Sequence, residues 1–265
     1  GVVIAFKDFT PKLGILGSPW AGFHHFTDFF NDPYFWDILW NTIRISLYGF
    51  CMFPFPIIFA LMINELTNAK FKKFVQMISY LPHFISTVVL VSIMNMVFSP
   101  INGLYGNLFR LFGGDGYPTD VRGIASSFRH MYVWSGVWQQ LGWNTIIYTA
   151  ALSSVSHELH EAAELDGASR WKRVIHVDFP TILPTVCTML IMRFGSIMGI
   201  GYEKVYLMQS DLNGTVSEVI STYTYKIGLL NGKYAFSTAV GLFNSVINVV
   251  LLIIANTTSK KFSEN

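Results

Sequence analysis

Residues 156–173 read SHELHEAAELDGASRWKR, and this charged stretch decides the fold because an apolar run of membrane length lies on each side of it. Ser156 is a residue type that caps helices, and Glu158 lies where the positive end of a helix dipole favours an acid. Gly167 suits the left-handed conformation that ends many helices. The pattern predicts a short helix, a break and a second short helix. Such an element is too polar for lipid and too short to be stable alone in water, so it needs a docking partner.

The apolar runs continue in both directions from this stretch. A helix rises about 1.5 Å per residue, so about 20 apolar residues cross a hydrocarbon core of about 30 Å. A barrel strand would be about half as long and would alternate polar with apolar residues. We therefore expect an all-α membrane protein, with five complete spans at 42–64, 74–98, 132–154, 181–201 and 235–256.

Composition agrees with this class. The 265 residues are 52% hydrophobic and 13% charged, whereas soluble domains carry roughly 25% charged residues. The two cysteines, Cys51 and Cys187, lie in separate apolar stretches and suggest neither a disulfide framework nor a metal motif. A net charge of +2 is too small to indicate nucleic-acid binding. We expect no catalytic and no metal-ligating residue. The nearest resemblance to a metal motif is His157-Glu-Leu-His160, but its histidines are three residues apart and not four as in zinc proteases.

The chain divides into three regions. Gly1–Phe6 resembles the last turns of a truncated span, so we expect six helices in the intact protein, and 1–40 is the end of that span with an extracytoplasmic segment. Residues 41–257 form the transmembrane domain, with a cytoplasmic loop at 155–180. Residues 258–265 form a cytoplasmic C-terminal tail. The remaining long segments, 99–131 and 202–234, should lie outside with 7–40.

This orientation follows from the positive residues beside short connections, which mark the cytoplasmic face of a membrane protein. They are concentrated in three places: after the first complete span, in the loop 155–180 and at the C-terminus. The residues are Lys70, Lys72, Lys73, Arg170, Lys172, Arg173, Lys260 and Lys261.

A polar stripe inside the third complete span is a candidate solute pathway. Gln140, Asn144 and Tyr148 recur every four residues and so share one helical face, with Trp143 beside it. A polar stripe at this depth should face protein or water, so the alternative is that it joins one helix to another. Arg193 lies near the middle of the fourth span and needs an acceptor from a loop, backbone carbonyls, a partner or the solute.

The loop 155–180 resembles the EAA loop of the permeases of ABC importers. The resemblance rests on Glu161-Ala162-Ala163, Asp166-Gly167-Ala168, Pro180 and Pro184 at the spacing typical of the family. It implies a type I ABC importer transmembrane bundle, in which this loop is the coupling helix that docks on the ATPase. Glu161 would then pair with a basic residue of the ATPase, Ala162 and Ala163 would allow close approach, and Gly167 would permit the sharp turn.

The same resemblance implies a set of partners. These are two ATP-binding subunits that carry ATP and magnesium, a second and non-identical permease subunit, and an extracytoplasmic solute-binding protein. The chain itself would be a transport subunit without a directly bound cofactor, in multiple passes through a bacterial plasma (inner) membrane and its lipid. Phe71–Phe84 and Ala239–Ser245 resemble permeases of the maltose-type subgroup, which implies a carbohydrate solute.

Other functions stay open at this point. A permease for peptides or other small solutes would share the loop. An ion-coupled secondary transporter would show paired intramembrane carboxylates or internal repeats, and a membrane enzyme would need convergent His, Asp or Cys residues. Gly228–Tyr234 is one residue short of a phosphate-binding loop and has Tyr234 where magnesium needs Ser or Thr, so ATP hydrolysis is not expected on this chain.

Overall fold

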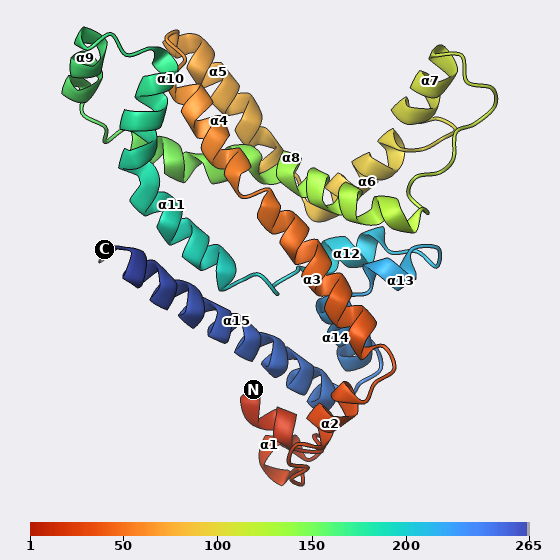
Figure 1. Cartoon of the computed structure of the whole chain (residues 1–265). Coiled ribbons are helices and arrows are strands. Elements are labelled where there is room, and N and C mark those ends of the chain that lie inside the picture. Colours follow the sequence, from red (N-terminus) through yellow and green to blue (C-terminus); the bar gives the residue numbers. More distant parts are fainter. Residues whose placement is uncertain (264–265) are drawn as a thin grey trace. The chain divides into compact units, whose positions relative to one another are not determined.

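The computed structural model describes residues 1–263, with side chains through residue 259, and the regular elements of this part are helices apart from one antiparallel bridge between Lys7 and Trp20 (Figure 1). Contacts divide the chain into two compact units. Unit 1 comprises Gly1–Tyr48, Thr87–Val133 and Gly195–Ile253, and unit 2 comprises Gly49–Ser86, Trp134–Phe194 and Ile254–Asn265.

The helices of the first half of the chain are η1 (Val2–Phe6), α1 (Gly14–Gly17), α2 (His24–Phe30), α3 (Phe35–Cys51), α4 (Pro54–Asn64), α5 (Ala69–Tyr80), η2 (Leu81–Phe84), α6 (Thr87–Val97) and α7 (Leu104–Leu111). The second half contains α8 (Ala125–Leu152), α9 (His157–Leu165), α10 (Arg170–Arg173), η3 (Val174–Asp178), α11 (Phe179–Phe194), α12 (Tyr202–Met208), α13 (Gly214–Ser217), α14 (Ile220–Tyr225), η4 (Lys226–Leu230) and α15 (Tyr234–Ser263). Because α15 runs to Ser263, it includes most of the predicted tail 258–265, whose last two residues lie outside the described residues.

Three helical stretches in the described part are long and apolar enough to cross a membrane: Phe35–Asn64, Arg170–Phe194 and Tyr234–Ser259. The first of them includes a turn at Met52 and Phe53, between α3 and α4. Pro54 begins α4, where its missing amide hydrogen is tolerated.

The predicted span 74–98 is not one continuous helix. It is divided among α5, η2 and α6, with Ile85 in an extended conformation between the last two. Pro82 removes a backbone donor just before the break, and the apolar composition of the run gave no sign of it. Neither side of the break is long and apolar enough to cross a membrane alone. Taken together, Ala69–Phe84 and Thr87–Val97 are, and they meet at a bend of 101°.

Helix α8 covers the predicted run 132–154 without a break, but begins earlier, at Ala125. It is not among the helices apolar enough to cross a membrane, because Gln139, Gln140 and Asn144 lower its mean hydropathy. A membrane crossing by α8 therefore stays a prediction.

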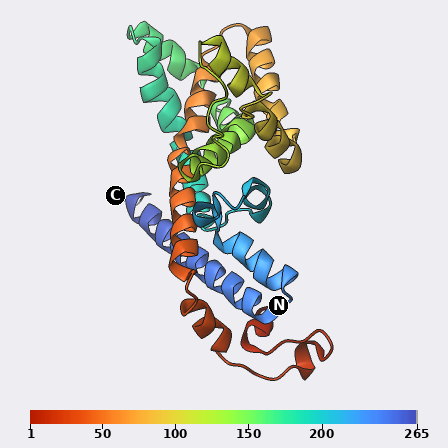
Figure 2. The same ribbon diagram turned by 90° about the vertical axis from the view of Figure 1, so that its right-hand side faces the viewer.

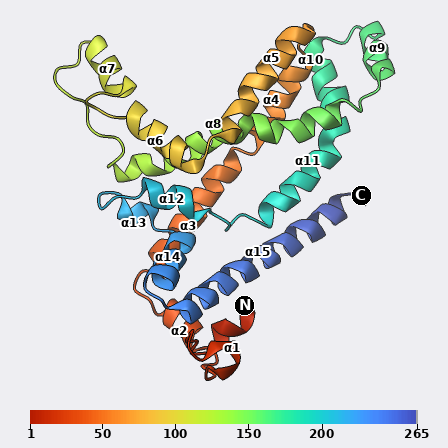
Figure 3. The ribbon, with the colours of Figure 1, turned by 180° about the vertical axis from the view of Figure 1, so that it is seen from behind.

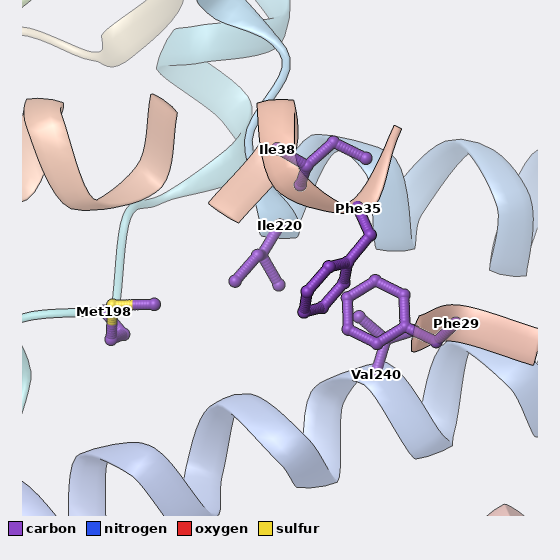
Figure 4. Close-up of a cluster of buried hydrophobic side chains, with 6 residues drawn as sticks. All are labelled: Phe29, Phe35, Ile38, Met198, Ile220 and Val240. Atoms are coloured by element: carbon purple, nitrogen blue, oxygen red, sulfur yellow. The ribbon is translucent and has the colours of Figure 1, made fainter. Parts of the chain in front are cut away.

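Unit 1 has two apolar clusters. In the first, an aromatic pair from α2 and α3 packs against residues of α14 and α15; its buried members are Phe29, Phe35, Ile38, Met198, Ile220 and Val240 (Figure 4). Helices α14 and α15 lie side by side here (Figures 1 and 2), and Ser237 Oγ donates a hydrogen bond of 3.1 Å to the carbonyl of Thr224. The second cluster joins α3, α8 and α12 with the residue before α14: Ile45, Phe128, Val205 and Val219.

Unit 2 packs α4, α8 and α11 around a third apolar cluster, whose buried members are Ile57, Ala60, Tyr148, Leu152, Ile182 and Val186. Helices α4 and α5 form an antiparallel hairpin in this unit (Figures 1 and 3). Helix α8 passes very close to the end of α5, because a Cβ atom at Gly142 would lie 2.1 Å from the carbonyl oxygen of Ser79. Only glycine fits at this crossing, and it fixes where α8 meets the hairpin.

Candidate functional site

The predicted helix, break and helix over 156–173 is present in the structure. The Ser156 side chain accepts a hydrogen bond of 3.2 Å from the amide of Glu158 at the start of α9, so the predicted cap is confirmed. Gly167 has a φ of +73°, the left-handed conformation expected at the end of this helix. The amide of Ala168 then donates to the carbonyl of Ala163 over 2.9 Å, which closes the turn.

The second short helix is not isolated. Helix α10 is continuous with η3, a π-helical turn, and with α11 beyond it (Figure 3). Together they form Arg170–Phe194, one of the three stretches long and apolar enough to cross a membrane.

An ion pair and a histidine–carboxylate contact tie α9 back to this junction. Glu164 near the end of α9 pairs with Arg173 of α10. His160 Nε2 lies 3.1 Å from Oδ1 of Asp178, whose side chain is fully buried in η3. Asp178 was not predicted as a functional residue, although an acidic residue at the start of an apolar run was a signal that could have identified it.

Several apolar side chains on α9 and α10 are accessible. Leu165 is 90% exposed and Trp171 74%, and Leu159 and Ala162 are also exposed on α9. Exposed apolar side chains grouped on a short helix indicate an interaction surface. The sequence reasoning named Ala162 but missed the two leucines and the tryptophan, whose signal was apolar residues at helical spacing among charges.

The structure places the predicted coupling residues in different surroundings. Glu161 is exposed and its carboxylate Oε1 lies 3.0 Å from Nδ1 of His157, one turn earlier. Ala163 and Ala168 are half-buried on the inner side of the turn, and Asp166 is exposed at the end of α9. Glu161 is therefore available at the surface for a partner.

A second polar site lies where α8 passes the break after α5. Nδ1 of His83 is hydrogen-bonded to Oε1 of Gln140 over 2.9 Å, and Nε2 of Gln139 donates to the carbonyl of Ile85 over 2.7 Å. The rings of His83 and Trp143 stack with centroids 4.0 Å apart and planes within 3°. Of the predicted pathway residues, the structure thus brings Gln140 and Trp143 together. It adds His83, a histidine within an apolar run that could have been noted from the sequence.

The other predicted pathway residues lie elsewhere. Asn144 is exposed, whereas Tyr148 is buried in the apolar cluster of unit 2, so the predicted stripe is divided between two environments. Arg193 is exposed near the end of α11, with its guanidinium beside Gly49, where an added Cβ would lie 3.6 Å from Nη2. Among the described residues there is no group of three or more His, Cys, Asp or Glu that could hold a metal ion.

Comparisons with known proteins identify the family. The sequence model of the family described as "Binding-protein-dependent transport system inner membrane component" matches residues 52–264. The polygalacturonan/rhamnogalacturonan transport system permease protein YteP of Bacillus subtilis (strain 168) is 40% identical over 267 residues, which cover 100% of this chain and 82% of that protein.

Two crystal structures have a similar fold. A bacterial ABC transporter involved in the import of the acidic polysaccharide alginate matches with a TM-score of 0.90 and 35% identity, over 98% of this chain and 87% of that one. A bacterial alginate ABC transporter in complex with alginate pentasaccharide-bound periplasmic protein matches with a TM-score of 0.87 and 36% identity, over 92% and 84%. The chain therefore belongs to the binding-protein-dependent transport system inner membrane components, a family of ABC transporter permeases that are transport subunits and not catalytic enzymes.

Proposed function

We propose that this chain is one of two permease subunits of an ATP-driven importer of oligosaccharides or polysaccharide fragments, and that α9 couples ATP hydrolysis on a separate subunit to solute movement. One observation carries the coupling role: a short, capped helix presents exposed Leu159, Ala162 and Leu165 to a partner while an ion pair and a histidine–carboxylate contact hold its other side. The relatives above are named for polysaccharide transport, which supports a carbohydrate cargo.

The proposed mechanism is alternating access. An extracytoplasmic binding protein delivers the solute, and closure of two ATP-binding subunits moves α9 together with the α9 of a second permease, which we expect to be a different chain. ATP and magnesium would bind only on the ATPase subunits. Such coupling requires contacts that differ between the two states, and a helix that moves as a rigid body with α10 and α11 can transmit them.

Solute would pass along α8, where polar and aromatic groups lie together. Gln140 and Trp143 with His83 offer hydrogen-bonding groups beside an aromatic face, and Asn144 lies exposed one turn along the same helix. Sugars present hydroxyls and an apolar CH surface, so they suit this combination. Arg193 stays a candidate for the same pathway.

A cross-linking experiment tests the docking of α9. A cysteine at the exposed Ala162, in a background with Cys51 and Cys187 replaced by serine because both are exposed, should form a cross-link with the ATPase subunit of the purified importer. A cysteine at the exposed Asn107 of α7, which we expect on the other side of the membrane, is the matched control. Equal capture of the ATPase by both cysteines, or by neither, would contradict the docking role.

A second experiment tests the turn. Gly167→Val should uncouple ATP hydrolysis from uptake, because a β-branched residue in the left-handed region costs about 1–2 kcal/mol. No atom lies within 4 Å of the position of a Cβ at Gly167, so the effect would come from the backbone and not from a clash. Gly167→Ala should show a smaller effect in the same direction, and uptake by the valine variant at the wild-type rate would refute the assignment.

A further inference from the structure

Three cationic residues flank, in the sequence, members of one apolar cluster in unit 1. Ile45 of α3, Phe128 of α8 and Val205 of α12 pack in this cluster, and each has a cation beside it in the sequence. The cations are Arg44, Arg129 and Lys204. Because the three apolar neighbours meet, three helices that are far apart in the sequence bring these charges to one junction.

Hydrogen bonds connect the three positions. Nη2 of Arg129 donates to Oδ1 of Asn41 over 3.1 Å, and Asn41 lies one turn before Arg44 on α3. Nζ of Lys204 donates to the carbonyl of Tyr132 over 2.9 Å and lies 4.8 Å from the centre of its ring. Tyr132 is one turn after Arg129 on α8. Each hydrogen bond thus joins one cation to a residue that lies one helical turn from another cation.

No carboxylate balances this charge within the described residues. The ion pairs found there include none to Arg44, Arg129 or Lys204. Burial and the neighbouring Arg44 lower the pKa of Arg129, and burial lowers the pKa of Lys204 to about 8. The Nε of Arg129 is buried and has no hydrogen-bond partner among the described residues. Arg129 and Lys204 are half-buried and Arg44 is exposed beside them. Half-buried cations without a counter-charge are costly, so the junction is suited to an anion.

We propose that Arg44, Arg129 and Lys204 bind a carboxylate of an acidic saccharide as it enters the importer. This inference rests on the carbohydrate function proposed above and narrows it to cargo with carboxylate groups. Arginine pairs with a carboxylate through two parallel hydrogen bonds, and lysine adds a point charge. Lys204 belongs to the segment 202–234, which we expect on the outer side, where the binding protein delivers its load.

An anionic lipid headgroup offers similar oxygen atoms, but the geometry favours the saccharide. Basic sites for anionic lipids are found chiefly on the cytoplasmic side of the membrane. Here Lys204 is half-buried at the junction of α3, α8 and α12, and its nitrogen donates to the backbone of α8.

The test is uptake by the complete importer in proteoliposomes with its binding protein, using pentagalacturonate and the same pentamer with its carboxyl groups reduced to alcohols. Lys204→Met and Arg129→Gln should each lower uptake of the acidic pentamer about tenfold below saturation, the loss expected for one charge-assisted hydrogen bond. Uptake of the neutral pentamer should stay unchanged. Lys204→Arg and Arg129→Lys should keep most of the activity.

Arg110→Gln is the matched control, because Arg110 is an exposed cation of α7 whose guanidinium donates hydrogen bonds to Ile101 and Asn107 and lies over the ring of Tyr117. Equal loss for both pentamers would assign a structural role and overturn the inference. So would a defect that appears only in vesicles containing phosphatidylglycerol, since the ligand would then be lipid. Transport of neither pentamer by the wild type would instead overturn the carbohydrate function itself.

Discussion

Replacing His160 by glutamine should loosen α9 from η3 and uncouple the importer. Asp178 is fully buried, and removal of one partner from a buried ion pair costs about 3–5 kcal/mol. His160 is 25% exposed, and Arg173 attracts the same carboxylate, so the loss should be smaller. We expect about 2 kcal/mol, which corresponds to a factor of about 30 in the population of α9 held against the junction.

Two measurements on the purified importer would detect this change. Amide hydrogen exchange in α9 should rise, because its tertiary anchor is weakened while its cap remains. The number of ATP molecules hydrolysed per solute transported should also rise, because motion of the ATPase would no longer reach α11 completely. The Glu164–Arg173 pair stays in place, so α9 should not unfold.

His157→Gln is the matched control, because His157 makes an exposed pair with Glu161 that contributes about 0.5 kcal/mol at most. His160→Gln with Asp178→Asn should recover much of the coupling, since a neutral amide pair needs no buried charge. Our reasoning would be refuted if the His157 and His160 variants had the same exchange and the same ATP ratio, or if the double variant were worse than either single one.

Three other perturbations follow from the structure. Ser156→Ala should lower the stability of α9 by about 1 kcal/mol, because the helix loses its N-terminal cap. Faster amide hydrogen exchange confined to the first turn of α9 would show this loss. Gly142→Ala should lower the melting temperature through an overpacking cost of about 1–3 kcal/mol, because its Cβ would meet Ser79; an unchanged midpoint would argue against the close crossing. Lys204 is charged below its pKa of about 8 and neutral above it, so uptake of an acidic pentamer should fall between pH 7 and pH 9 in the wild type but not in Lys204→Arg.

The structure of the segment 156–173 could be predicted in detail because its signals are local. Ser156 and Gly167 act on the backbone within a few residues, and their conformational preferences do not depend on the rest of the fold. The apolar runs other than 74–98 likewise indicated where the long helices lie, because membrane length is a property of the run itself.

Other features depended on contacts between distant residues. The His160–Asp178 pair joins two elements across the turn at Gly167, and each residue alone had an ordinary surface interpretation. The break after η2 is supported by Gln139 and Gln140 of α8, more than fifty residues further along the chain, so hydropathy could not reveal it. For the same reason Tyr148 was placed on a pathway, whereas α4 and α11 bury it.

The π-helical turn at Val174–Asp178 adds one residue to the helix between α10 and α11. A π-turn holds one residue more than an α-turn of similar rise, so it can be removed by a shift in register without breaking the helix. Conversion to α-helix would turn everything on one side of it by about 100° relative to the other, the rotation of one residue in a helix of 3.6 residues per turn. A small displacement along the helix axis at η3 could therefore be converted into a rotation of α11 relative to α10.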